Sequence, residues 1–385
     1  MKSSTVPRLG ILFTALFAIL IARQAYVQLV MRPEIAAQPY NPRHALGAAN
    51  RGRILASDGT VLAHTVGGKR EYPVHEELAQ TVGYVSDRYG TSGLEDAYDR
   101  ALTPADTTGD VGAQIDELAA AFAGKQTISR GADVVTTIVP RIQHVLYAQL
   151  AQHARAAGIV LDPRTGAVLA IASVPSFDPN TLASDFNGLV HDPASPLLNR
   201  AINGLYPPGS TFKIFTASAA LNAGVVQMDS TFYDPGFVQI GDFTLHDNEG
   251  EATGTQDLTG AFALSSNVDF GKIAMQMGSE KFYRYMHDWG IGDSLQFQLP
   301  VALDRVPERS RVLEGELAQM GFGQGALLAT PLRVALLAAT IADDGTEPYG
   351  RHEAVRRKLR SVPRCRGRPR KHDCCRPVSE RAATC

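Results

Sequence analysis

The first of the four cysteines in this 385-residue chain is Cys365, so residues 1–364 contain none. A body without cysteine suits an extracytoplasmic location in which stability does not depend on disulfides. The ten histidines show no His-x-x-x-His or comparable spacing, so no metal site is predicted. No internal repeat is visible either. With 44% apolar residues, the chain is long enough for two globular modules.

The chain also lacks an uninterrupted apolar run of about 20 residues, the length that spans a bilayer. Leu9–Ala22 is uncharged, follows two basic residues, and is interrupted by Arg23 before apolar residues resume. We expect residues 9–30 to form an uncleaved signal anchor, with residues 1–8 cytoplasmic and the body outside the cell membrane. A cleaved signal peptide is the alternative, because 14 residues also suit a signal-peptide core.

The segment 207–213, Pro-Pro-Gly-Ser-Thr-Phe-Lys, places Ser210 three residues before Lys213 at the start of an apolar stretch typical of a helix. Residues three apart share one face of a helix, so the hydroxyl and the amine are predicted to meet. A partly desolvated lysine is a base that activates serine, and a first helical turn offers N–H groups to an oxyanion. By itself this pattern more often marks a capped helix with an exposed lysine.

A second motif, Ser265-Ser266-Asn267, follows Ser210 by 55 residues. The hydroxyl of Ser265 is suited to relay a proton, and the amide of Asn267 is suited to hold both the lysine and a substrate amide. Alone, Ser-Ser-Asn indicates a helix N-cap or a loop. After Ser-x-x-Lys at this distance, it indicates an acyl-transfer site.

With both motifs in place, the chain resembles the class B penicillin-binding proteins, the monofunctional D,D-transpeptidases that cross-link the bacterial cell wall. Its short spacer is similar to that of the actinobacterial penicillin-binding protein A group. The resemblance covers most of residues 8–345 and is carried by the segments Asn50–Leu55, Tyr89–Glu95, Asp162–Ala170, Pro175–Asn180, Asn199–Ala201, Gly323–Gly325 and Thr330–Leu332.

The resemblance implies acyl transfer through a serine acyl-enzyme on peptidoglycan stem peptides or their lipid-linked precursor, with β-lactams as covalent inhibitors. It implies no cofactor and no nucleic acid, and it suggests a membrane glycosyltransferase and division proteins as partners. It assigns catalysis to Ser210, Lys213, Ser265 and Asn267, and substrate binding to Gly209 and Thr211. We expect burial beside the motif residues, with no carboxylate close by, to lower the pKa of the lysine.

The family's third motif, Lys-Thr-Gly or Lys-Ser-Gly, is absent, because no lysine here is followed by Thr-Gly or Ser-Gly. Arg164-Thr165-Gly166 lies before Ser210 between two apolar runs and is predicted to be a hairpin turn. In the family the missing strand supplies one oxyanion donor, which is typically worth on the order of 3 kcal/mol, and grips the substrate carboxylate. Its absence also predicts an open sheet edge, so we expect this chain to be impaired.

The last 35 residues differ in character from the body. Residues 351–385 hold 12 Lys and Arg against 3 Asp and Glu, whereas the rest of the chain holds 25 against 36. A basic arm for nucleic acid or a membrane surface is one interpretation. A Cys/His metal site is another, although adjacent Cys374 and Cys375 fit no standard zinc spacing. The favoured hypothesis is translation in a shifted reading frame, which requires Lys-Thr-Gly in another frame.

The predicted fold class is α+β. After the anchor we expect a small mixed pedestal module, similar to a dimerisation module, at 31–157. An incomplete transpeptidase domain, like the serine β-lactamases, follows at 158–345 with helices around an antiparallel sheet, and 346–385 form an aberrant, disordered tail. Helices are predicted at Glu95–Leu102, 113–123, Pro140–Ala157 and Val334–Ile341.

Two other functions fit parts of the sequence. A serine β-lactamase shares both motifs but needs a further base for rapid deacylation, and an anchor with a pedestal argues against it. A catalytically inactive membrane scaffold or β-lactam sensor is the second alternative, in which the anchor and the pedestal bind division proteins.

Overall fold

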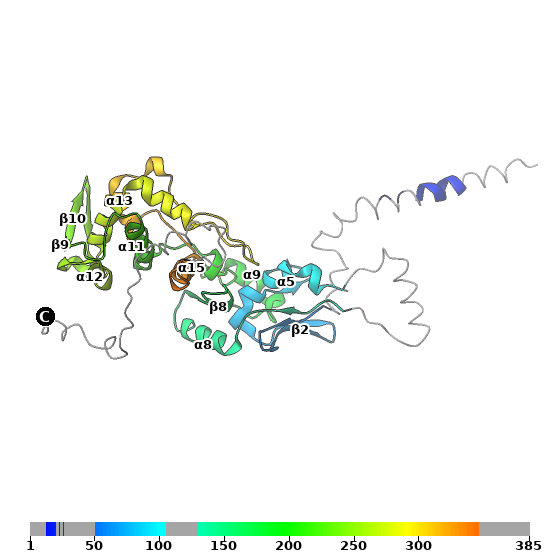
Figure 1. Cartoon of the computed structure of the whole chain (residues 1–385). Helices are drawn as coiled ribbons and strands as arrows, with labels where there is room; N and C mark the ends of the chain where they lie inside the picture. The colour runs from blue at the N-terminus through cyan, green and yellow to red at the C-terminus, as the bar shows by residue number, and fades with distance from the viewer. Residues whose placement is uncertain (1–12, 21–22, 24–25, 27–50, 105–129, 346–385) are drawn as a thin grey trace, which may run out of the picture. The chain divides into compact units, whose positions relative to one another are not determined.

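The computed structural model describes residues 13–20, 23, 26, 51–104 and 130–345. The backbone forms two compact units of mixed helix and sheet (Figure 1). The first unit holds the described residues up to Tyr206 together with Ser294–Leu303 and Ala329–Ala335. The second holds Pro207–Asp293, Asp304–Leu328 and the described residues from Leu336 onward.

The segments expected at either end lie largely outside these ranges. Only ten residues of the predicted anchor are described, and the predicted helix at 113–123 and the basic tail lie outside the description altogether. Within the described residues, no helix has the length and apolar character needed to cross a membrane.

The first unit opens with a four-stranded sheet in the order β3-β2-β1-β6. Gly67 and Gly68, both with positive φ, make the turn between β2 and β3, where only glycine adopts this backbone without strain. The short β1 pairs antiparallel with β2 and parallel with β6. The strands are β1 (Ile54–Leu55), β2 (Val61–Val66), β3 (Lys69–Glu71) and β6 (Val134–Val135), and a separate pair is β4 (Val85–Ser86) with β5 (Gly90–Thr91).

A buried ion cluster joins this sheet to two short helices. Glu95, fully buried on α5 (Gly93–Ala97), accepts from Arg51 Nε at 2.6 Å and from Arg70 Nε at 2.7 Å. Arg51 also donates to Asp99, on α6 (Asp99–Leu102), at 2.6 Å. The predicted helix at 95–102 is therefore two helices, because Tyr98 leaves the helical backbone between them.

A hairpin of β7 (Ala156–Leu161) and β8 (Val168–Val174) carries the turn predicted at residues 164–166. Gly166 N donates to Asp162 O at 2.9 Å, so that prediction is confirmed. Helix α8 (Pro140–Leu150) packs on the hairpin through Gln143, whose amide pairs with both backbone groups of Ile171.

Helix α8 differs from its prediction in two ways. It ends at Leu150 rather than at residue 157, because the chain turns there to enter β7. The spacing of Ile142, Val145, Leu146, Gln149 and Leu150 predicts one buried face, but Val145 is 55% exposed and the polar Gln143 is buried instead. The remaining helices of this unit are η1 (His75–Leu78), α4 (Ala79–Val82), α9 (Leu182–His191) and α10 (Arg200–Asn203).

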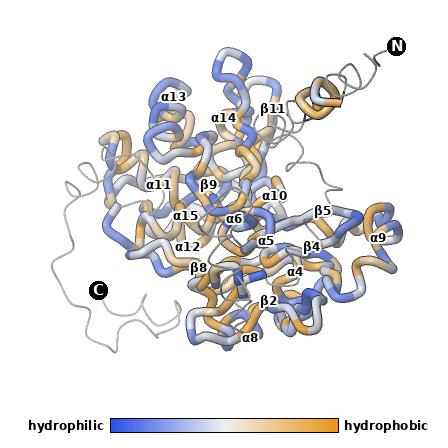
Figure 2. The backbone as a smooth tube through the Cα atoms, turned by 90° about the vertical axis from the view of Figure 1, so that its right-hand side faces the viewer, coloured by the Kyte–Doolittle hydropathy of each residue, from blue (hydrophilic) through white to orange (hydrophobic). Residues whose placement is uncertain are grey.

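The second unit is built around α11 (Lys213–Asn222), α13 (Asn267–Asp288) and α14 (Glu314–Gly321). Its core is aromatic: the ring of Phe215 meets those of Phe282 and Trp289 edge-on, at centroid distances of 5.5 and 5.6 Å. Apolar and hydrophilic stretches alternate along the backbone, as is expected of amphipathic helices and strands that bury one face (Figure 2).

Two antiparallel pairs, β9 (Phe232–Asp234) with β12 (Gly254–Gln256) and β10 (Phe237–Ile240) with β11 (Phe243–His246), complete the second unit. Its shorter helices are η3 (Gly209–Phe212), η4 (Asn248–Gly250), α12 (Leu258–Ala263) and η5 (Arg309–Arg311). Helix α15 (Pro331–Ala342) contains the predicted helix at 334–341.

Candidate active site

Ser210 lies on the single 3-10 turn η3, and Lys213 is the first residue of α11. Gly209 begins this turn with a φ of 60°, and its N–H donates to Gly323 O at 2.8 Å. Thr211 closes the turn by donating from Oγ1 to Pro208 O at 2.5 Å. This turn leaves the Ser210 side chain exposed to solvent.

The Lys213 amine, by contrast, is buried, with 2% of the residue exposed. It donates to Ser265 Oγ and to Asn267 Oδ1, each at 3.0 Å, and also to the backbone oxygen of Ser265. The two motifs, 52 residues apart, therefore meet at this amine. None of its three acceptors is the Ser210 hydroxyl, so the structure brings three of the four predicted catalytic residues into one hydrogen-bonded group and places the fourth beside it in sequence.

The backbone holds the second motif firmly. Ser265 has a φ of 57°, in the left-handed region that costs a non-glycine residue about 1 kcal/mol or more. Ser266 then caps α13, its Oγ accepting from Asp269 N at 2.9 Å, and Asn267 opens the helix. Ser266 is therefore the helix N-cap, while Ser265 and Asn267 on either side of it contact the Lys213 amine.

Burial lowers the pKa of Lys213 from 10.5 to about 8, although Asp247 and Asp269 both act to raise it. The rings of Phe270 and Phe322, with centroids 5.4 and 6.0 Å from the amine, supply part of the apolar surroundings. The expectation that no carboxylate lies close by was wrong. The structure instead places two carboxyl groups near enough to the Lys213 amine to raise its pKa.

These carboxyls belong to a buried acidic group behind the second motif. Asp234 and Asp269 are fully buried, and Asp247 is 6% exposed. They come from the end of β9, the residue after β11, and the first turn of α13. Sequence reasoning missed them, because Asp234-Pro235-Gly236 has the composition of an ordinary turn.

Comparison with known proteins decides which family carries this site. Residues 156–349 match the penicillin-binding protein transpeptidase domain, and residues 51–134 match the penicillin-binding protein A dimerisation domain. The chain belongs to the penicillin-binding protein transpeptidases.

Several relatives place it more closely within these transpeptidases. The peptidoglycan D,D-transpeptidase PbpA of Mycolicibacterium smegmatis is 33% identical over 375 residues, covering 90% of this chain and 74% of that protein. The D,D-transpeptidase MrdA of Escherichia coli is 32% identical over 237 residues, covering 56% of this chain and 36% of that protein. The imipenem acyl-enzyme of penicillin-binding protein A from Mycobacterium tuberculosis superposes with a TM-score of 0.70 at 33% identity, over 78% of this chain and 73% of that one.

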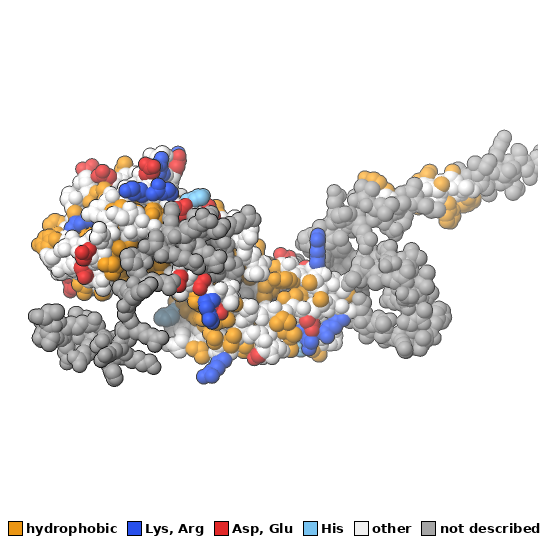
Figure 3. Space-filling view, viewed as in Figure 1, with side chains coloured by type: hydrophobic (Ala, Val, Ile, Leu, Met, Phe, Trp, Pro, Cys, Tyr) orange, Lys and Arg blue, Asp and Glu red, His pale blue; other side chains and the backbone are white. Residues whose placement is uncertain are grey.

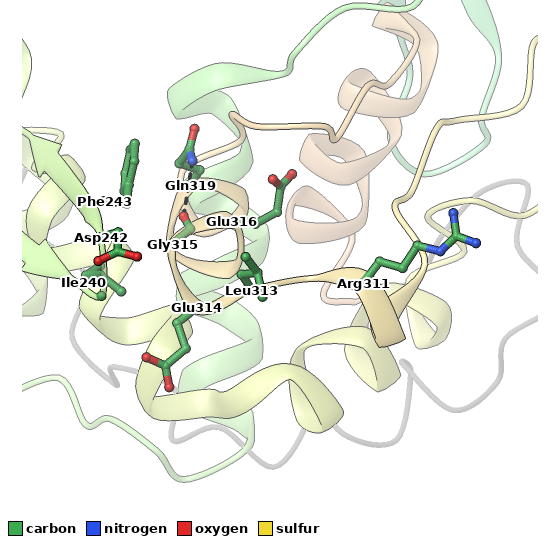
Figure 4. Close-up of a pocket in the computed structure, with 10 residues that line it drawn as sticks. Ile240, Asp242, Phe243, Arg311, Leu313, Glu314, Gly315, Glu316 and Gln319 are labelled. Carbon is green, nitrogen blue, oxygen red and sulfur yellow. Dashed lines mark hydrogen bonds between the residues drawn. The ribbon is translucent and has the colours of Figure 1, made fainter.

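This transpeptidase chain also has a pocket of about 520 Å³ at the tip of the β10–β11 hairpin (Figure 4). The hairpin contributes Ile240 and Phe243, and the start of α14 contributes Glu314 and Glu316. None of the six predicted site residues lines it. Within the described residues, no group of three or more His, Cys, Asp or Glu is arranged to hold a metal ion. On the face shown in Figure 3, charged side chains of both signs are interspersed with apolar ones.

Gly323 packs closely against the η3 turn that carries Ser210. It has a φ of 76°, and a Cβ placed on it would lie 2.2 Å from Gly209 O, the backbone of the residue before Ser210. We expect Gly323→Ala to push the turn outward and to lower the rate of Ser210 acylation by roughly 100-fold, the cost of misplacing a reacting group by about 1 Å. Penicillin-labelling rates measure this effect. Gly224→Ala, at a positive φ with nothing within 4 Å, is the matched control, and equal losses in both variants would contradict the proposed contact.

Proposed function

We propose that this chain is a peptidoglycan D,D-transpeptidase that works through an acyl-enzyme on Ser210. The observation that supports the proposal most strongly is the buried Lys213 amine, held between Ser265 and Asn267 three residues after an exposed serine. Relatives named peptidoglycan D,D-transpeptidases, and neighbours solved as imipenem and penicillin G acyl-enzymes, support the same chemistry.

In the proposed first half-reaction, neutral Lys213 accepts the Ser210 proton while the serine oxygen attacks the carbonyl of the penultimate D-alanine of a stem peptide. The peptide bond to the terminal D-alanine breaks, and the leaving amine takes a proton through Ser265 Oγ, which hydrogen-bonds to the lysine. The products are an ester on Ser210 and free D-alanine.

In the second half-reaction, an amine from a neighbouring stem peptide attacks the ester and releases Ser210. The new amide is the cross-link, and the proton lost by the attacking amine returns to the serine oxygen through the same lysine. Gly209 holds the turn through its backbone N–H and Thr211 through its side-chain hydroxyl, and this is the support that we propose they give to substrate binding.

The proposal extends to the setting of the reaction. We propose that residues 9–30 anchor the chain in the cell membrane, with the catalytic part outside, where peptidoglycan precursors and a membrane glycosyltransferase meet it. No Lys-Thr-Gly or Lys-Ser-Gly occurs in residues 1–385. We propose that these residues by themselves are acylated more slowly than a relative that carries the motif, by roughly 10² to 10³-fold, which is the cost of one oxyanion donor.

Prolonged incubation with a fluorescent penicillin, followed by digestion and mass spectrometry, tests the proposal. We expect one adduct, on the peptide that contains Ser210, and none in Ser210→Ala. Ser218→Ala on α11, where the hydroxyl donates to Ile214 O at 2.8 Å, should label normally. An adduct elsewhere, or none after saturation, would refute the proposal. Fast penicillin hydrolysis without an accumulating adduct would favour a β-lactamase.

A further inference from the structure

Two buried carboxyl groups, those of Asp234 and Asp247, accept hydrogen bonds from the residues of the second motif. Asp247 Oδ1 accepts from Asn267 N at 2.8 Å and from Asn248 N at 2.9 Å. Asp234 Oδ2 accepts from Ser266 Oγ at 2.8 Å. Each of the two residues that follow Ser265 is therefore fixed by a different carboxyl of this pair.

The hydrogen bonds of the two acids are unequal. Besides Ser266, Asp234 accepts from Thr253 Oγ1 at 2.8 Å and from Gly236 N at 2.7 Å, so three donors surround its two oxygens. Asp247 Oδ2, although buried, has no hydrogen-bond donor directed at it. A buried oxygen without a donor is unfavourable if the group is ionised, and it becomes favourable if that oxygen carries a proton and donates it.

The acceptor for such a proton is Asp234, which is held next to Asp247 through one shared residue: Gly236 N donates to Asp234 Oδ1 at 2.7 Å, and Asp247 N donates to Gly236 O at 2.9 Å. Two neighbouring buried carboxylates repel each other, which favours a state in which the pair holds one proton. The three donors around Asp234 favour its ionised form and therefore assign the proton to Asp247. Burial, followed by the interaction with Asp234, raises the pKa of Asp247. The hydrogen bonds that Asp234 accepts lower the pKa of Asp234, although burial acts to raise it.

We propose that Asp234 and Asp247 are a positioning pair that shares a single proton, carried by Asp247, and that this proton limits the negative charge facing Lys213 while the pair fixes Ser266 and Asn267. An ionised Asp247 would stabilise the protonated lysine and reduce the fraction of active base. The same carboxyl, once protonated, keeps its two hydrogen bonds from the backbone through Oδ1. The pair thus holds Ser266 and Asn267 in place and keeps the negative charge near the Lys213 amine low.

The other charged groups around the pair are few. Asp269, whose pKa is raised chiefly by burial, accepts from Gln256 Nε2 at 2.6 Å. Lys272 donates to Tyr233 O at 2.5 Å and lowers the pKa of Asp269. Asp269 also acts on Lys213, so it is the neighbour against which any charge effect of Asp247 must be compared.

The first test does not depend on catalysis. The infrared spectrum of the full chain at pH 7 should contain a protonated carboxyl band that disappears in Asp247→Asn and persists in Asp269→Asn. Persistence of the band in Asp247→Asn, or its loss only in Asp269→Asn, would overturn the assignment of the proton. This outcome is independent of whether Ser210 is acylated.

The second test rests on the proposed acylation of Ser210 and uses rescue by the conservative variant. Asp247→Ala should slow penicillin labelling by roughly 10- to 100-fold, because Asn267 loses its support. Asp247→Asn should restore most of the rate, with the same pH midpoint as the original chain, because its amide reproduces a protonated carboxyl. Asp234→Asn should not rescue Asp234→Ala, because its NH2 group would face donors. A pH midpoint lowered by Asp247→Asn, or equal rescue at both positions, would show that Asp247 is ionised.

Discussion

Replacing Lys213 with methionine is expected to reduce the rate of Ser210 acylation by about 10² to 10⁴-fold, the usual contribution of a general base. Methionine fills similar space but accepts no proton, and it leaves the oxygens of Ser265 and Asn267 without their donor. The rate of labelling by a fluorescent penicillin measures the loss. Lys272→Met is the matched control, because this lysine donates to Tyr233 O and, among the residues that the structure describes, forms no hydrogen bond with a predicted site residue.

The same residue fixes the pH dependence of acylation. Because the pKa of Lys213 is lowered to about 8, the neutral base accumulates as the pH rises through that value. The labelling rate of the original chain should therefore rise about tenfold per pH unit below 8 and level off above it. A flat profile between pH 6 and 9 would mean that the lysine is not the base.

The lowered pKa of Lys213 should also make the free energy of unfolding depend on pH. The unfolded chain keeps the ordinary lysine pKa of 10.5 and the folded chain has about 8, so between these values the unfolded state binds one more proton. The free energy of unfolding, compared with that of Lys213→Met, should then increase by about 1.4 kcal/mol per pH unit over this window. The contribution is complete above 10.5 and is lost as the pH falls to 8, a difference on the order of 3 kcal/mol.

Replacing Glu95 with alanine is expected to destabilise the first unit by about 3–5 kcal/mol. This fully buried carboxylate pairs with Arg51 and Arg70, both less than 8% exposed, and its loss leaves two guanidinium groups without their main counter-charge. A loss of this size approaches the whole stability of many domains, so residues 51–102 should lose their protection from hydrogen exchange.

A matched control separates this effect from ordinary surface electrostatics. Asp133 pairs with Arg53 at 2.6 Å, but the arginine side chain is 42% exposed, so Asp133→Ala should cost no more than about 1 kcal/mol. The single tryptophan, Trp289, lies in the core of the second unit, and its fluorescence follows that unit separately. Equal exchange protection in the Glu95 and Asp133 variants would contradict the central role of the buried cluster.

The parts of the site that sequence predicted share a physical reason. Ser210 and Lys213 sit on adjoining turns of one short segment, and Ser265 to Asn267 occupy the entrance to one helix. Local backbone preferences determine such arrangements, so spacing alone predicts them. The hairpin turn at residues 164–166 was predicted for the same reason, because its polar residues separate two apolar strands.

What sequence did not predict depends on contacts between distant segments. Asp234 ends β9 and Asp247 directly follows β11, so the two become a pair only when β9 and β11 are brought against α13. Arg51 and Glu95 belong to two separate sequence motifs, and because they are 44 residues apart in the sequence, neither motif predicts their ion pair. The predicted end of α8 is wrong because the helical sequence pattern continues to residue 157, whereas residues from Ala156 onward form β7 and pair with β8.

The left-handed backbone of Ser265 has a consequence for protein engineering. Glycine and asparagine adopt this conformation more easily than serine, so a selection for heat resistance alone would favour replacing the residue. Such a variant would gain thermal tolerance and lose the hydroxyl that contacts the Lys213 amine. A stabilised library of this protein therefore needs an acylation screen at every round, because a stabilising change at Ser265 removes the hydroxyl beside Lys213.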